Sequence, residues 1–341
     1  MKYISFAVPC YNSQAYMNKC IDSLLSGGED VEIIIVNDGS KDDTLKIANE
    51  YAAKYPSIVK VIDKENGGHG SGVNAGLKTA SGLYYKVVDS DDWLDVTEFA
   101  KLLETVKKHY ADNTSPDAYI TNYVYEHVAD NTTFLSEYRD NIPTEKLCGW
   151  DEVKNFRYSK VLMMHSIWYK RDKLLESNTV LPEHTFYVDN LYMYKPMPYI
   201  KTLYYMDLDV YRYFIGRSDQ SITMKNVLSR YEQQIRVTLL MIDAYKWDEM
   251  KKMPKGLRTY LWQVLNAVMS MTFFYVCGEY SKERKAAYKQ MWAHIKQNDI
   301  KMYKKLRHGS YSTLIVYLPW KLRGAICMRA YKILCKKKKM G

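Results

Sequence analysis

Asp89 and Asp91 are two carboxylates one residue apart, on either side of Ser90, directly after the apolar run at residues 83–88. Both side chains can reach one hard cation, and Mg²⁺ or Mn²⁺ bound by carboxylate and phosphate oxygens is the natural occupant. Such a cation neutralises a diphosphate leaving group. The alternative interpretation is structural, because the next residue, Asp92, could cap a following helix.

Three further polar clusters follow the other apolar runs of the first ninety residues. They are Pro9 to Asn12, Asn37 to Ser40 and Asn66 to Gly70. In an open α/β sheet, ligands bind at the carboxyl ends of the strands, so we expect the four clusters to form one site. Loops are polar in most proteins. An ordinary turn, however, does not require the carboxylates or glycine runs that three of these four clusters contain.

The elements that must position these clusters alternate between strand and helix patterns. Lys86 lies inside the fourth strand, as a buried ion-pair partner or an edge residue. The alternation implies a parallel sheet with helices on both faces. The sequence predicts strands at 3–8, 31–36, 58–62 and 83–88, and helices from Asn12 or Ser13 to Gly27, at 41–55 and at 71–80.

Beyond residue 95 the pattern is mixed and then becomes helical. Residues 259–278 carry no charge and approach the length of a transmembrane helix, but polar side chains interrupt them, which favours a buried core helix. Strands are predicted at 118–125 and 203–213, and helices at 151–160 and 189–195.

The net charge of +10 is unevenly distributed along the chain. Residues 1–224 contain 24 Lys and Arg against 32 Asp and Glu, whereas residues 225–341 contain 25 against 7. We therefore expect a catalytic domain at 1–224 and a basic helical region at 225–341. The apolar and basic residues of 311–341 are typical of an interfacial amphipathic segment on an anionic membrane surface. The alternative is a solvated helix face followed by a disordered tail.

Other features of the composition bear on location and partners. The six cysteines form no CxxC pair, and the N-terminus lacks the pattern of a signal peptide. We expect a cytoplasmic protein, peripheral on the inner face of the membrane if the basic end binds there. No nucleic-acid partner is expected, because the first part is acidic and no nucleic-acid-binding motif is present.

In their order, the four clusters resemble family 2 glycosyltransferases with the GT-A fold. The motifs AVPCYN, IIIVNDGSKDDT, NGGHGSGVNAG and VVDSDDW carry the resemblance over about residues 3–100. It implies a GT-A-like α/β fold, with a mostly parallel sheet flanked by helices, ahead of the basic α-helical C-terminal region. It also implies inverting transfer from a UDP-sugar, with Mn²⁺ or Mg²⁺, to a hydroxyl of a glycan or lipid-linked acceptor. Similarity to bacterial members indicates synthesis of a cell-surface polysaccharide, teichoic acid or glycoprotein glycan.

The resemblance also assigns roles to residues of the first ninety positions. Asp38 would contact the base of the donor, and Pro9 and Tyr11 would line the uridine pocket. Asp89 would lie on the ribose or phosphate side, and Asp91 would bind the metal. The other expected donor-binding residues are Asn12, Asn66, Gly68, His69, Gly70, Asn74 and Ser90.

The family places its catalytic base in a Glu-Asp pair before a helix. The corresponding stretch, 184–190, reads HTFYVDN, so Asp189 takes the place of the Asp and Val188 replaces the Glu. Asp189 would accept the proton of the acceptor hydroxyl, a contribution of about 10²–10⁴-fold in rate. The alternative role for Asp189 is a helix N-cap.

Residues 212–223 resemble the mobile loop of the family. Arg217, Ser218, Gln220 and Ser221 would close over the diphosphate, for which a bidentate Arg is well suited. A surface hairpin turn is the equal alternative.

Two other classes of protein are compatible with parts of this pattern. A sugar-phosphate nucleotidylyltransferase needs a Gly-rich signature with Arg and Lys after the first strand, and the turn at 9–12 lacks it. A non-catalytic nucleotide-sugar-binding scaffold with a degenerate GT-A site is the remaining alternative. The joint presence of Asp38, Asp89, Asp91 and Asp189 argues against that scaffold.

Overall fold

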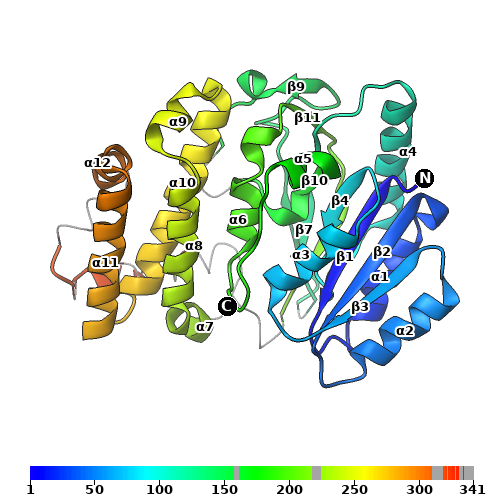
Figure 1. The fold of residues 1–341 in the computed structure, drawn as a ribbon, viewed down its shortest axis with the longest axis horizontal. Coiled ribbons are helices and arrows are strands. Elements are labelled where there is room, and N and C mark those ends of the chain that lie inside the picture. The colour runs from blue at the N-terminus through cyan, green and yellow to red at the C-terminus, as the bar shows by residue number, and fades with distance from the viewer. Residues whose placement is uncertain are drawn as a thin grey trace. The chain divides into compact units, whose positions relative to one another are not determined.

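A computed structural model describes residues 1–128, 130–156, 161–216, 224–308, 318–320, 322–326, 328–329 and 333 (Figure 1). The chain divides into two compact units. The first comprises Met1–Lys154 and Leu162–Ile215, and the second comprises Asn155–Val161 and Gly216–Gly341. Most of the basic segment 311–341 lies outside the described residues.

The first unit is built on an eight-stranded sheet with the order β3-β2-β1-β4-β10-β6-β11-β9. Its first four strands are parallel, and Figure 1 shows them side by side. β1 and β2 are buried along their whole length, as their β-branched and apolar residues predict. The parallel sheet predicted from the alternating pattern is confirmed. Its strands are β1 Ile4–Cys10, β2 Val31–Asp38, β3 Val59–Lys64 and β4 Tyr84–Val87.

Helices connect and flank these strands. The prediction that Asn12 or Ser13 caps the first helix is wrong, because α1 begins at Met17 and has no side-chain cap. Asp95 is the cap of α4, since its carboxylate accepts bonds from the amides of Thr97 and Glu98. The helices are α1 Met17–Leu25, α2 Thr44–Lys54, α3 His69–Thr79 and α4 Val96–Ala111, with the short 3₁₀ turn Gly28–Asp30 before β2.

The other half of the sheet is mixed. β10 runs antiparallel to both β4 and β6, β11 is parallel to β6, and β9 is antiparallel to β11. A second sheet has the order β5-β12-β7-β8. The strands of the large sheet are β6 Ala118–Ile120, β9 Leu147–Gly149, β10 Ile167–Lys170 and β11 Thr202–Tyr205. Those of the second are β5 Trp93–Leu94, β7 Tyr123–His127, β8 Thr132–Ser136 and β12 Tyr211–Ile215.

Two strand predictions were wrong in the same way. Segments 118–125 and 203–213 each form two strands that belong to different sheets. The break in the first falls at Asn122, whose side-chain amide donates to the carboxylates of Asp207 and Asp209. These bonds hold together the two places where the chain passes from the large sheet to the second sheet. The apolar residues on either side of Asn122 gave no sign of a break.

The helix predicted at 151–160 is also wrong. Only the 3₁₀ turn Trp150–Glu152 forms, and residues 157–160 lie outside the described part of the chain. The backbone N–H and C=O of Phe156 bond to the side chain of Gln263 instead of to helical neighbours. The remaining short elements of the first unit are the 3₁₀ turns Met164–Ser166 and Met197–Tyr199 and the helices α5 Arg171–Glu176 and α6 Asp189–Tyr194.

The second unit is helical, as the sequence predicts. α10, Lys255–Cys277, is the helix in the described residues that is long and apolar enough to cross a membrane by length and composition. It is packed as a core helix instead, with 67% of its most apolar window buried. Thr272 of α10 bonds to Gln234 and Thr238 of α8 inside this core. The other helices are α7 Met224–Ser229, α8 Tyr231–Ala244, α9 Trp247–Lys252, α11 Lys282–Asn298 and α12 Ile300–His308.

Candidate active site

The loops after the four parallel strands are joined by hydrogen bonds. The amide of Asn12 donates to Ser40 Oγ at 3.0 Å, and Asn12 Oδ1 accepts from the amide of Lys41 at 2.8 Å. Ser13 Oγ lies 2.8 Å from Ser90 Oγ. The first loop therefore contacts both the second and the fourth, and the site expected at this edge of the sheet is a single connected structure.

Asp38 ties the second loop to the third. One carboxylate oxygen accepts bonds from Lys64 Nζ at 2.7 Å and from the amide of Gly67 at 2.9 Å. The other accepts from the amide of Gly68 at 2.7 Å and from Asn66 Nδ2 at 3.1 Å. The side chain is 4% exposed. Since a carboxylate has about four acceptor sites, Asp38 is fully engaged in holding this turn.

The other residues expected in the uridine pocket differ in exposure. Pro9 is buried in β1, and a Cβ placed on Gly72 of α3 would lie 2.9 Å from its ring. Tyr11 is 54% exposed, so its ring is available to a ligand. Arg217, Ser218, Gln220 and Ser221 lie outside the described residues.

His69, the first residue of α3, contacts Asp89 directly. Its Nε2 lies 2.8 Å from Asp89 Oδ1. Burial alone would lower the pKa of His69, but the charge and hydrogen bond of Asp89 raise it above its usual value. Burial likewise opposes ionisation of Asp89, yet His69, His165 and Lys86 lower the pKa of that carboxyl. At neutral pH the pair is therefore a carboxylate beside an imidazole that binds its proton more firmly than usual.

His165 approaches Asp89 from the other side. Its Nε2 lies 3.9 Å from Asp89 Oδ2, and its side chain is almost fully buried. Burial lowers the pKa of His165 to about 4, so the ring is neutral. Nothing in the sequence singled out this residue: it stands in an irregular stretch, and only the antiparallel pairing of β10 with β4 brings it to the site.

Asp92 is a buried structural carboxylate rather than a helix cap. Its Oδ2 accepts from the hydroxyl of Tyr211 at 2.5 Å, and its Oδ1 accepts from the amide of Phe214 at 2.8 Å. Burial, with the neighbouring charges of Asp91 and Asp89, raises the pKa of Asp92 well above its usual value. Asp92 thereby fixes β12 beside the loop that follows β4.

Lys86 is fully buried beneath the same loop. Its Nζ donates to the backbone carbonyls of Met164, His165 and Ile167, at 2.8, 2.6 and 3.2 Å. Burial lowers its pKa well below the usual value. Lys86 is therefore buried, as one of the two expectations had it, and not an edge residue. Its hydrogen-bond partners are carbonyl groups, however, and it forms no ion pair within 4 Å among the described residues.

The segment that leads to Asp189 is fastened to α3. Asn74 Nδ2 donates to the carbonyl of Leu181 at 2.8 Å, and Asn74 Oδ1 accepts from its amide at 3.0 Å. Ser71 Oγ donates to Glu183, and the amide of His184 donates to the carbonyl of Gly67 at 2.6 Å. Gly70 allows this close approach, because a Cβ there would lie 2.9 Å from Leu181 Cβ.

Asp189 is the first residue of α6, and that helix has no side-chain cap bond. Burial raises its pKa above the usual value, with the charge of Asp89 acting in the same direction and that of His69 opposing. Two nearby residues have left-handed backbone angles, His184 at φ 47° and Tyr187 at φ 65°. Such strain is found where the surrounding structure fixes a functional segment.

Three side chains in the described residues could hold a metal ion together. Ligand atoms of Asp89, Asp92 and His165 all lie within 4.8 Å of one another. This group shares Asp89 with the predicted pair, whereas half-buried Asp91 is outside it. Oxygen and nitrogen donors suit Mn²⁺. Both oxygens of Asp92 already accept hydrogen bonds, so Asp89 is the member best placed to bind a cation.

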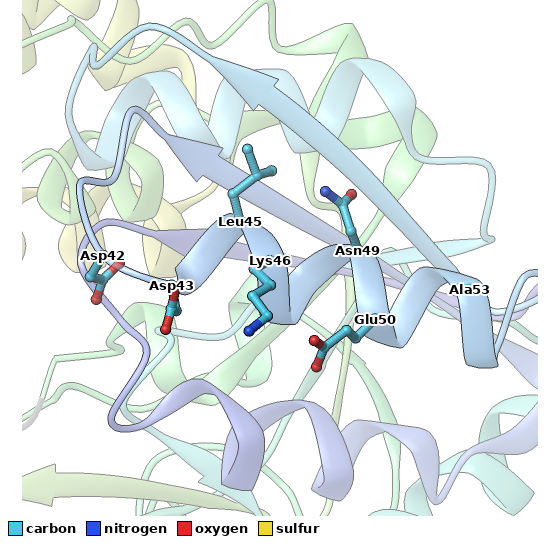
Figure 2. A pocket seen from close by; sticks show the side chains of 7 residues that line it. All are labelled: Asp42, Asp43, Leu45, Lys46, Asn49, Glu50 and Ala53. Atoms are coloured by element: carbon cyan, nitrogen blue, oxygen red, sulfur yellow. The ribbon is translucent and has the colours of Figure 1, made fainter.

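A hollow on the surface of α2 is separate from these residues. Figure 2 shows the seven side chains that line it, and none of them is a site residue identified from the sequence or from the strand-end loops. They are Asp42, Asp43, Leu45, Lys46, Asn49, Glu50 and Ala53.

Comparison with known proteins agrees with this fold. Residues 5–189 match the family model for glycosyl transferase family 2. This is more than half of the chain, which therefore belongs to glycosyl transferase family 2.

Two relatives and one solved structure illustrate the similarity. The protein EpsH of Bacillus subtilis is 29% identical over 245 residues, which are 68% of this chain and 64% of EpsH. The minor teichoic acid biosynthesis protein GgaB of the same species is 37% identical over 108 residues, 31% of this chain and 12% of GgaB. The chain thus spans less than two thirds of either relative.

Residues 1–349 of S. aureus TarS, in complex with UDP-GlcNAc, align with a TM-score of 0.68 at 19% identity, covering 100% of this chain and 93% of that one. The predicted fold class is confirmed.

Proposed function

We propose that this protein is a metal-dependent inverting glycosyltransferase that transfers a sugar from a UDP-sugar to an acceptor hydroxyl. One observation supports the proposal: residues 67–74, which include the start of α3, contact both the loop after β4 and the segment that ends at Asp189. His69 bonds to Asp89 on the donor side, and Gly67, Ser71 and Asn74 fasten the segment that ends at Asp189.

Asp189 would act as the general base. Its raised pKa makes it a stronger base than an ordinary carboxylate, which favours proton transfer near neutral pH. The acceptor oxygen attacks the anomeric carbon and gives its proton to Asp189, while the bond from that carbon to the UDP oxygen breaks on the opposite face. The new glycosidic bond has the inverted configuration, and UDP leaves with the electron pair.

The donor would lie along the strand ends. Exposed Tyr11 would offer a face for the uracil ring, Asn12 and the turn bound by Asp38 would form the floor, and Asp89 would face the phosphates. A divalent cation held by Asp89 and Asp91 would neutralise the diphosphate. The solved complex of TarS with UDP-GlcNAc supports this donor, because the same fold binds it there. Arg217, Ser218, Gln220 and Ser221 complete the proposed donor site.

The proposed pathway is the assembly of a cell-surface polysaccharide, teichoic acid or glycoprotein glycan. The name of GgaB supports it, since that relative is a minor teichoic acid biosynthesis protein. The basic residues of 225–341, 25 Lys and Arg against 7 Asp and Glu, would hold the enzyme at an anionic leaflet through 311–341. Deletion of 311–341 should abolish binding to phosphatidylglycerol vesicles; unchanged binding contradicts this role.

Calorimetric titration with UDP, with and without Mn²⁺, tests the donor assignment. The wild-type protein should bind UDP more tightly with Mn²⁺, and Asp91→Ala should remove the gain. Asp43→Ala is the matched control, because Asp43 is an exposed carboxylate at the start of α2. Absence of UDP binding under both conditions would refute the proposed donor.

A further inference from the structure

The position of His165 points to a part of the donor that the nucleotide loops do not reach. The turn Met164–Ser166 leads directly into β10, which lies beyond β4 in the sheet order β3-β2-β1-β4-β10. The proposed uridine contacts follow β1 and β2. Neighbouring strands lie about 4.8 Å apart, so a ligand that begins over β1 and β2 presents its other end to β4 and β10.

The ring of His165 is held on several sides. It stacks on Tyr213 with centroids 4.5 Å apart and an interplanar angle of 23°. Tyr211 meets it edge-on at 4.9 Å, and Tyr123 lies at 5.4 Å. Tyr211 is in turn fixed by Asp92. The imidazole therefore has little rotational freedom, which is typical of a group that recognises a ligand.

The backbone under this ring is equally constrained. Lys86 Nζ binds the carbonyls of Met164, His165 and Ile167 from inside the core. A buried ammonium whose hydrogen bonds go to carbonyl groups is costly to desolvate, so its presence indicates that the conformation of this turn matters.

The two nitrogens of His165 have different surroundings. Nδ1 is buried without a hydrogen-bond partner among the described residues, whereas Nε2 faces Asp89 Oδ2 at 3.9 Å. An acceptor is more cheaply left unpaired than an N–H, so the proton belongs on Nε2. A separation of 3.9 Å is too long for a hydrogen bond. This separation leaves room for one ligand oxygen that accepts a hydrogen bond from His165 Nε2–H and donates one to the Asp89 carboxylate.

A hydroxyl group is the ligand chemistry that can do both. We propose that His165 and Asp89 together bind a hydroxyl of the hexose ring of the donor, so that His165 is a specificity-determining residue. This inference rests on the proposed function. Lys86, Tyr211 and Tyr213 are positioning residues that act through His165.

The test compares UDP with UDP-hexoses on the full chain. Affinities for UDP, UDP-glucose, UDP-galactose and UDP-N-acetylglucosamine are measured by calorimetry with Mn²⁺, for wild type and for His165→Phe. Phenylalanine keeps the stacking on the tyrosines and removes the N–H. His109→Phe is the matched control, because His109 also packs on tyrosines, Tyr119 and Tyr204, but on α4.

The expected result is selective. His165→Phe should weaken the tightest UDP-hexose by about 3–10-fold, the usual effect of losing one hydrogen bond, and should leave UDP affinity unchanged. An equal loss for UDP and UDP-hexose would overturn the inference and assign His165 to the cation or diphosphate. Unchanged affinity for every ligand would also overturn it. Failure of the wild type to bind UDP would instead refute the proposed function.

Discussion

His69 Nε2 lies 2.8 Å from Asp89 Oδ1, and this contact joins the first turn of α3 to the loop after β4. Asp89 thus has an imidazole at each oxygen, with His165 on the other side. The two rings differ in how firmly they bind a proton, because the pKa of His69 is raised by its hydrogen-bonded partner whereas burial lowers that of His165 to about 4.

Asp89→Asn should lower the pKa of His69. The Asp89 carboxylate contributes most to the upward shift of the pKa. Without it, burial favours the neutral ring and is opposed only by the charges of Asp189 and Asp91. Titration of the His69 ring protons by NMR would measure the change. Asp91→Asn is the comparison variant and should shift His69 less. A pKa of His69 that is the same in wild type and Asp89→Asn would contradict the pairing.

Glu32 should make stability depend on acid pH. It is 1% exposed and accepts bonds from Ser5, Lys60, Ser81 and the amide of Gly82. Burial opposes its ionisation, but these bonds lower its pKa from 4.5 to about 2. A carboxyl whose pKa is lower in the folded than in the unfolded protein stabilises the fold at pH values above its unfolded pKa. This stabilisation by Glu32, about 3 kcal/mol, is lost as the pH falls from about 4.5 towards 2.

Urea unfolding of Glu32→Gln between pH 3 and pH 7 would measure the contribution of Glu32 to the free energy of unfolding. The variant should have a weaker pH dependence of stability than the wild type and be less stable at pH 7. Glu50→Gln is the control, since Glu50 is exposed on α2. Equal pH dependence in Glu32→Gln and wild type would exclude Glu32 as the source.

Lys86→Met should destabilise the first unit by about 2–5 kcal/mol. The substitution leaves three buried carbonyls without their donor, and each unpaired group costs about 1–3 kcal/mol, partly offset by removing a buried charge. Thermal unfolding measures the loss. Lys46→Met is the control, because Lys46 is exposed on α2. An unchanged melting temperature in Lys86→Met would show that the carbonyls find other partners.

Asp189→Asn should slow sugar transfer without weakening UDP binding. The amide cannot accept the acceptor's proton, so the transfer rate should fall by about 10²–10⁴-fold, while Mn²⁺-dependent UDP affinity stays at the wild-type value. Release of UDP in a coupled assay and calorimetry measure the two quantities. Glu183→Gln, a change on the same segment, is the comparison. Full transfer activity in Asp189→Asn would remove Asp189 as the base.

The sequence by itself determined the first ninety residues, and with them the class of protein. β1 to β4 follow from short β-branched runs, and the polar residues after each run fall at one edge because parallel strands end together. Asp38, His69, Asp89 and Asn74 could be identified because local patterns and motif order carry that information. The helical second unit and its buried α10 were likewise evident from composition and periodicity.

The tertiary structure decided how the second half of the first unit completes the site. The breaks at Asn122 and after Tyr205, which send consecutive strands into different sheets, depend on bonds between residues far apart in the chain. His165 reaches Asp89 only because β10 pairs antiparallel with β4, and Lys86 acquires its role only from carbonyls on that same turn. Non-local pairing of this kind leaves no periodic or compositional trace, so a local pattern could reveal neither residue's role.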